Sequence, residues 1–226
     1  METREWAYGV PQVSVVGDGY CFPYCKELVV KKRIKGLSNA LFEVFDPCDN
    51  IILHVEGGVW NFRMKRVFRD ASGFPVLTLY GKQSLTLWHK WSAYINEESP
   101  SPEGTNNNSI TNNNNNNLLF TVKQSHPLQI KKDLNVYLAD HHTLSNNNIN
   151  NPMKKIGAPD FNVIGSYTSL SFKVYKGHRI LAEVKHNFTL ESFYKGKERY
   201  TIKVYPEVDY AFIIALLVII DENDTP

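Results

Sequence analysis

The sequence predicts a mainly β protein: a closed, roughly twelve-stranded antiparallel β-barrel around a central hydrophobic C-terminal α-helix. Two observations carry this prediction. Apolar and polar residues alternate with a period of two along much of the chain, as in strands with one buried face. Residues 211–220 are all apolar, and a helix of this kind needs cover on every side. A closed barrel supplies that cover and leaves no exposed sheet edge.

The predicted strands are short segments in which apolar residues share one parity. They include 41–45, 51–55, 60–64, 75–80, 118–122, 134–138, 170–175, 180–185 and 200–204. Turns rich in Asp, Asn, Pro and Gly follow at 46–50, 70–73 and 176–178, and these are residues that tight turns require. The segments around the three turns resemble one another, which indicates a repeated hairpin. Residues 85–94 form a further candidate strand whose register the pattern leaves open.

The central helix is predicted over residues 206–221. Pro206 suits a first helical turn, and Glu207 and Asp209 favour the positive end of the helix. The apolar run would extend only about 15 Å as a helix, roughly half of a bilayer core. We therefore expect the barrel to enclose it and expect no transmembrane span.

The domain organisation follows from this pattern. We expect an N-terminal tail over residues 1–12 and a single barrel domain over residues 13–226. Two Asn-rich insertions, 97–117 and 145–151, hold too few apolar residues to pack and are predicted to be solvated loops.

Composition limits the classes of partner and compartment. A net charge of +2 does not favour nucleic-acid binding. The three cysteines, an odd and low number, favour a reducing compartment over a disulfide framework. The first ten residues lack an apolar signal-peptide core, so we expect a cytoplasmic protein. We also expect a monomer.

Motifs for catalysis or cofactor binding are not found, so we expect neither enzyme activity nor a cofactor or metal. Cys21 and Cys25 have no second ligand pair at metal-site spacing, and small, partly buried residues are the simpler interpretation. Residues 140–142 (Asp-His-His) would direct adjacent imidazoles to opposite faces of a strand. Residues 46–50 match only part of a calcium loop, and a hairpin turn explains them better.

Two basic clusters form a candidate patch for anionic ligands such as phospholipid headgroups. Its members are Lys31, Lys32, Arg33, Arg63, Lys65 and Arg66. The alternative is an ordinary solvated barrel exterior whose cations are balanced by nearby acids.

Four separate motifs resemble, in order, the plant LURP-one-related family. They are residues 15–57, KRVFRDASGFPVLTL at 65–79, LTLWHKWSAY at 85–94 and YPEVDYAFIIALLVIIDE at 205–222. The family is similar to the C-terminal domain of tubby proteins and to phospholipid scramblases. The resemblance therefore implies a twelve-stranded barrel around a hydrophobic C-terminal helix, in agreement with the periodicity.

The resemblance also implies a function. We expect a non-enzymatic intracellular binding module that acts in plant defence or stress response through protein partners still to be identified. Tubby domains bind phosphoinositides, so the alternative is a peripheral tether at the cytosolic face of the plasma membrane that uses the basic patch. The chain lacks the cysteine-rich and calcium-binding motifs that flank a longer helix in scramblases, which argues against lipid translocation.

Overall fold

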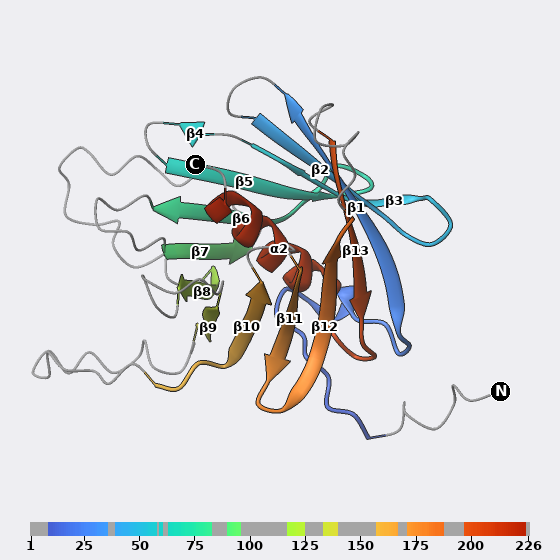
Figure 1. The fold of residues 1–226 in the computed structure, drawn as a ribbon, viewed down its shortest axis with the longest axis vertical. Coiled ribbons are helices and arrows are strands. Elements are labelled where there is room, and N and C mark those ends of the chain that lie inside the picture. Colours follow the sequence, from blue (N-terminus) through green and yellow to red (C-terminus); the bar gives the residue numbers. More distant parts are fainter. Residues whose placement is uncertain are drawn as a thin grey trace, which may run out of the picture.

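A computed structural model of the protein describes most of the chain. The described residues are 9–35, 39–57, 59–60, 63–82, 90–95, 117–124, 133–139, 157–166, 171–187 and 197–224. One antiparallel sheet curves around the C-terminal helix α2 (Tyr210–Asp224), which is drawn in red in Figure 1. The early strand β1 (Lys26–Lys35) lies beside the last strand, β13 (Lys197–Val204), so the two halves of the chain meet in the sheet.

Thirteen strands are present within the described ranges. Besides β1 and β13 they are β2 (Asn39–Phe45), β3 (Ile51–Glu56), β4 (Val59–Trp60), β5 (Arg63–Asp70), β6 (Pro75–Lys82), β7 (Lys90–Ile95), β8 (Leu118–Gln124), β9 (Leu134–Leu138), β10 (Phe161–Ser166), β11 (Ser171–Lys176) and β12 (Arg179–His186). The strand order is β3-β2-β1-β13-β12-β11-β10-β9-β8-β7-β6-β5, and pairing of β3 with β5 closes the ring. The two-residue β4 pairs only with β5. The predicted closed barrel of roughly twelve strands is confirmed.

The repeated hairpin predicted from the sequence is present three times. Strand pairs β2–β3, β5–β6 and β11–β12 are antiparallel neighbours joined by the three predicted turns. Each pair has a register irregularity just before its turn, at Val44/Phe45, Phe68/Arg69 and Val174/Tyr175. An irregularity of this kind bends a strand and increases its twist, which helps a sheet to close into a barrel.

The strand β7 settles the register that the sequence left open. Trp91 and Ala93 are buried, and Trp91 lies opposite Gly81 of β6. A Cβ atom at position 81 would lie 2.9 Å from the indole ring of Trp91, so the glycine leaves the space that this ring needs. The rest of the candidate strand, residues 85–89, lies outside the described residues.

Helix α2 fills the barrel. Every residue from Ala211 to Ile219 is at most 1% exposed. The ring of Phe212 packs edge-on against Phe120 of β8, with ring centroids 5.2 Å apart, and lies 5.0 Å from the ring of Phe161 of β10. The helix is thus enclosed as predicted. Among the described helices, none combines the length and apolar character needed to cross a membrane.

The predicted ends of the helix need correction. Pro206 and Glu207 form a turn, Glu207 has a φ of 62°, and the helix begins at Tyr210. The side chain of Asp209 instead caps the first turn, since its Oδ1 accepts a hydrogen bond from the amide of Phe212 at 3.0 Å. At the other end the helix continues three residues beyond Asp221, to Asp224.

The tail and the insertions are described only in part. Residues 9–12 are described, and Val13 then forms a parallel bridge with Val208 just before the helix. The Asn-rich insertions lie outside the described residues, apart from Asn117, whose carbonyl oxygen accepts a 2.9 Å hydrogen bond from the amide of Ile95.

Candidate functional site

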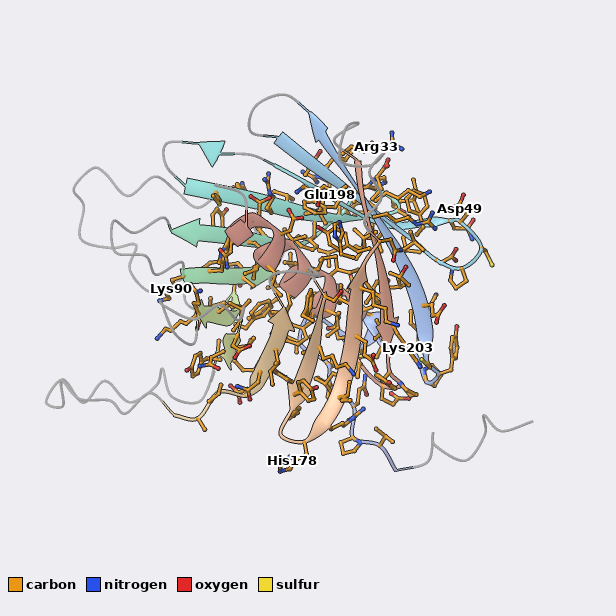
Figure 2. The ribbon with its side chains drawn as sticks, in the orientation of Figure 1. Arg33, Asp49, Lys90, His178, Glu198 and Lys203 are labelled. Atoms are coloured by element: carbon orange, nitrogen blue, oxygen red, sulfur yellow. The ribbon has the colours of Figure 1, made fainter. Side chains whose placement is uncertain are left out.

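Two cations of the predicted basic patch lie on the outer side of β1. The ammonium group of Lys31 lies 3.4 Å from Asp49 and 3.8 Å above the ring of Phe45. The guanidinium of Arg33, whose side chain is 52% exposed, lies 3.0 Å from Glu43. Figure 2 shows Arg33 and Glu198 close together at one end of the barrel, in agreement with the pairing of β1 and β13.

Two other members of the predicted patch point into the barrel. Lys32 is buried, and its ammonium group lies 2.8 Å from Oδ2 of Asp221 and 3.6 Å from Oε2 of Glu198. Arg66 is also buried, and its Nε and Nη2 lie 2.9 and 2.5 Å from Oε1 of Glu222. Nη1 of Arg66 also donates to the carbonyl of Gly57. These two cations are counter-ions of the helix, so their assignment to an outer surface is corrected.

The physical reason lies at the C-terminal end of α2. Asp221 and Glu222 place negative charge where the helix dipole is already negative, which is unfavourable unless cations compensate. Lys32 and Arg66 supply that compensation from the barrel wall. Burial is the largest single effect and lowers the pKa of the Lys32 ammonium group, but the carboxylates of Asp221, Glu198 and Glu222 together outweigh it and raise that pKa.

The strand periodicity contained a signal for this arrangement. Lys32 shares the parity of Leu28 and Val30, and Arg66 shares that of Phe68, all of which face inward. A cation on the apolar parity of a strand indicates a buried partner. The acidic partners, Asp221 and Glu222, lie near the end of the chain, too far away in sequence for the strand pattern to identify them.

The remaining two patch residues lie on β5. Lys65 is half-buried, and its ammonium group is 5.7 Å from the ring centroid of Tyr80. The side chain of Arg63 lies outside the described residues. The structure therefore does not bring the six residues to one surface, and ligand binding at the exposed cations stays a prediction.

The other candidate motifs resolve in different ways. Asp46 binds its own turn, since Oδ1 accepts the amides of Cys48 and Asn50 at 2.8 and 2.9 Å, which confirms the hairpin turn. Sγ of Cys21 lies 3.7 Å from the carbonyl oxygen of Val13, and burial raises the pKa of this thiol. In the part of the chain that the structure describes, no group of three His, Cys, Asp or Glu residues could hold a metal. Residues 140–142 lie outside it.

An open depression of about 430 Å³ lies on the outer face of strands β9, β10 and β11. Its side chains come from all three strands and from the β11–β12 turn. The lining includes Asp133, Asn135, Asn162, Ile164, Tyr175 and His178. We refer to it as the outer depression. Figure 2 shows His178 at the tip of this turn, at the opposite end of the barrel from Arg33.

A cross-strand row forms the middle of the outer depression. Asn162 of β10 lies opposite Asn135 of β9 on one side and opposite Tyr175 of β11 on the other. Nδ2 of Asn162 donates to Oδ1 of Asn135 at 3.0 Å. Among the described residues, this bond leaves the carbonyl oxygen of Asn162 and the amino group of Asn135 without a further partner, so both can bind a ligand.

One acid and one apolar side chain complete the outer depression. Oδ1 of Asp133 is buried and has no hydrogen-bond partner among the described residues. Ile164, on the outward parity of β10, is 49% exposed. The sequence pattern alone does not reveal this site. A polar residue at an outward position of a strand is typical of a solvated surface, and only the strand register brings these positions together.

Comparison with known proteins gives a consistent result. The sequence profile of the family described as LURP-one-related matches residues 26–221. Protein LURP-one-related 14 of Arabidopsis thaliana is 40% identical over 220 residues, which cover 97% of this chain and 95% of the relative. Protein LURP-one-related 9 of the same plant is 36% identical over 213 residues, covering 93% and 98%.

A solved structure is also similar. The X-ray structure of a protein from Arabidopsis thaliana superposes with a TM-score of 0.58 at 28% identity. The match covers 92% of this chain and 97% of that one, so the similarity extends over the whole barrel.

Proposed function

Since the chain belongs to the LURP-one-related family, we propose that it is a non-enzymatic binding module that recognises a protein partner through the outer face of its barrel. One observation carries this proposal: helix α2 occupies the barrel interior, where related architectures with open lumens hold ligands. A partner of this barrel then has to bind outside. The outer depression supports the same view, because it combines hydrogen-bonding and apolar side chains.

The chemistry of the outer depression favours recognition over catalysis. Its central pair, Asn135 and Asn162, are amides that donate and accept hydrogen bonds but do not ionise near neutral pH. Ile164 adds an exposed apolar contact beside them. Side chains of this kind give a protein surface specificity for shape and for hydrogen-bonding groups.

The biological setting of the proposal is the plant cytoplasm. The relatives in Arabidopsis thaliana support the plant setting, and the link of some family members to plant defence motivates a role in defence or stress response. Plants that lack the protein should then differ from wild-type plants in pathogen growth or stress survival. Equal performance under every challenge would remove this part of the proposal.

A surface substitution tests the binding module. Ile164→Lys adds one charge to the exposed face of β10, and Ala71→Lys adds the same charge at the exposed β5–β6 turn. Wild-type protein and the Ala71→Lys control should capture the same partner from plant extract, and Ile164→Lys should lose it. Equal capture by both variants would place recognition elsewhere, and capture of nothing above an unrelated barrel protein would overturn the proposal.

A peripheral phosphoinositide tether is a second candidate. The outward position of Lys31, Arg33 and Lys65 favours it, although Asp49 and Glu43 already pair with the first two cations. Lys31→Ala with Arg33→Ala should weaken binding to phosphoinositide vesicles, by about 1 kcal/mol per charge, and Lys173→Ala with Lys203→Ala should serve as the control. If wild-type protein does not bind such vesicles at low salt, this candidate function is refuted.

A further inference from the structure

We propose that the outer depression is a recognition site for an arginine side chain presented by the partner protein. This inference rests on the proposed function, because it names the chemical group that the binding module would take up. The residues that would act are Asp133, Asn162, Tyr175 and Ile164, all of which line the outer depression.

The acid provides the first argument. Oδ1 of Asp133 is shielded from water, yet no hydrogen bond reaches it within the described part of the chain. An unpaired carboxylate oxygen in such a position is unfavourable. The residue lines the open depression, so a cation bound there would compensate the negative charge of its carboxylate. Hydrogen bonds between a cation and a carboxylate are also stronger than neutral ones.

The amide row provides the second argument, which favours guanidinium over ammonium. Within the described part of the chain the carbonyl oxygen of Asn162 accepts no hydrogen bond, since this side chain uses its Nδ2 to bind Asn135. In the register of β9 and β10, Leu134 lies opposite Val163. Asp133, one residue before Leu134, therefore lies near Ile164, which is two residues from Asn162. A guanidinium carries five N–H donors in one plane and can bond to two separated acceptors at once.

The remaining lining provides the third argument. Tyr175, directly across from Asn162 on β11, places an aromatic side chain beside the acceptors. Arginine stacks on aromatic faces better than lysine does. The exposed Ile164 offers an apolar surface for the alkyl stem of the arginine. A volume of about 430 Å³, open to solvent, admits a side chain that is attached to a larger partner.

The test is an NMR titration. Each probe is added to the isotope-labelled protein, and the backbone amide signals report which residues it contacts. The probes are N-acetyl-arginine amide and an arginine-containing pentapeptide, each compared with its citrulline counterpart, which has the same shape without the charge. We expect shifts at residues 133–135, 162–164 and 175–178 with both arginine probes and much weaker shifts with citrulline. Tighter binding of the pentapeptide than of the single amino acid would identify a chain-borne arginine as the ligand.

Two variants sharpen the test. Asp133→Asn removes the charge and keeps the shape, and should weaken binding of the arginine pentapeptide at least about tenfold. Asp49→Asn makes the same change of charge in the β2–β3 turn, where asparagine tolerates the positive φ of 63°, and should leave binding unchanged. If Asp133→Asn does not fold, the arginine and citrulline comparison on the wild-type protein still decides.

Three outcomes would overturn the inference: no shifts at these residues, equal binding of citrulline, or full binding by a folded Asp133→Asn variant. The proposed function fails separately. A partner that is captured from extract equally by wild-type protein and Asp133→Asn, and lost with Ile164→Lys, would keep the binding module and remove the arginine site.

Discussion

At the scale of residues, the buried cluster at the end of the helix controls the energetics. Lys32 lies 2.8 Å from Asp221, and the hydroxyl of Tyr200 lies 2.6 Å from the other oxygen of the same carboxylate. Tyr200 also reaches Oε2 of Glu198 at 2.7 Å. Removing water from these charged groups is unfavourable, so each charge depends on its partner. Loss of one partner therefore lowers the free energy of unfolding more than loss of the whole pair does.

A double-mutant cycle should expose this dependence. Lys32→Met and Asp221→Leu should each lower the free energy of unfolding by about 3 kcal/mol or more, and the double variant should lose clearly less than the sum. Urea unfolding measures all four proteins. The more exposed pair, Lys31→Met with Asp49→Asn, is the control and should change stability by less than about 1 kcal/mol. Strictly additive losses at Lys32 and Asp221 would show that the two groups do not support each other.

Lys32 and two buried tyrosines, one near each end of the helix, predict loss of stability in alkali. Burial, then the charges of Asp221 and Glu198, raise the pKa of Tyr200, and burial raises the pKa of Tyr210 to about 12. The pKa of Lys32 is raised as well. Above about pH 10 the unfolded chain releases protons that the folded chain retains, so stability is full below that pH and falls as pH rises.

The measurement compares urea midpoints at about pH 9 and about pH 11. Wild-type protein should lose stability over this interval, and Tyr200→Phe should lose less, because phenylalanine has no proton to release. An identical loss in the two proteins would show that Tyr200 does not contribute to the alkaline transition.

At the scale of elements, one side chain joins the helix to the N-terminal segment. Oδ2 of Asp209 accepts hydrogen bonds from the amides of Val15, Val16 and Gly17 at 3.1, 2.7 and 3.2 Å. Its Oδ1 caps the helix at Phe212. Burial raises the pKa of this carboxyl group, and the four amide donors oppose that shift. The N-terminal segment and the start of the helix should therefore be stable only together.

Replacement of this carboxylate tests the joint. Asp209→Asn substitutes an amino group for one acceptor oxygen and leaves buried amides without a partner, so it should lower the free energy of unfolding by about 2–3 kcal/mol. Asp18→Asn is the matched control, because the Asp18 side chain is exposed and, among the described residues, accepts a hydrogen bond only from Gln12, at 3.2 Å. Hydrogen exchange should show faster exchange at residues 15–17 in Asp209→Asn. Unchanged exchange there would contradict the anchoring role.

At the scale of the whole molecule, the helix is the core and the barrel is its cover. The inward-facing side chains of the strands pack on α2 in one hydrophobic core. Without the helix the inner face of the barrel would be exposed, and without the barrel the helix would be exposed. Ten consecutive apolar residues, 211–220, are buried in this way. Eight of them are Phe, Ile, Leu or Val. At about 1.5–3 kcal/mol per side chain, burial of these eight stabilises the protein by roughly 12–24 kcal/mol, comparable to or larger than the net stability of about 5–15 kcal/mol that is typical of a protein.

Removal of the helix should therefore abolish folding. A chain that ends at Tyr205 is expected to lack the β-sheet circular dichroism of the full-length protein and to elute as an expanded or aggregated species in gel filtration. The full-length chain prepared in parallel is the control. A compact, soluble, β-rich product would show that the barrel holds together without its helix and would refute this account of the core.

The sequence by itself determined the barrel and its helix. Three local patterns carried this information: period-two alternation, three similar hairpin turns and ten uninterrupted apolar residues. Each pattern reflects which side chains face water and which are buried. The inward parity of Lys32 and Arg66 was visible in the same alternation. Their acidic partners were not, because Asp221 and Glu222 lie far along the chain.

Only the tertiary structure brought the residues of the outer depression together. Strand register placed Asn135, Asn162 and Tyr175 in one row and brought Asp133 beside them, although these residues are separated by up to 42 positions. It likewise turned two of the six predicted patch residues, Lys32 and Arg66, into buried counter-ions. The physical reason is that alternation specifies which face a side chain occupies, whereas its neighbours on that face are set by the hydrogen-bonded pairing of distant strands.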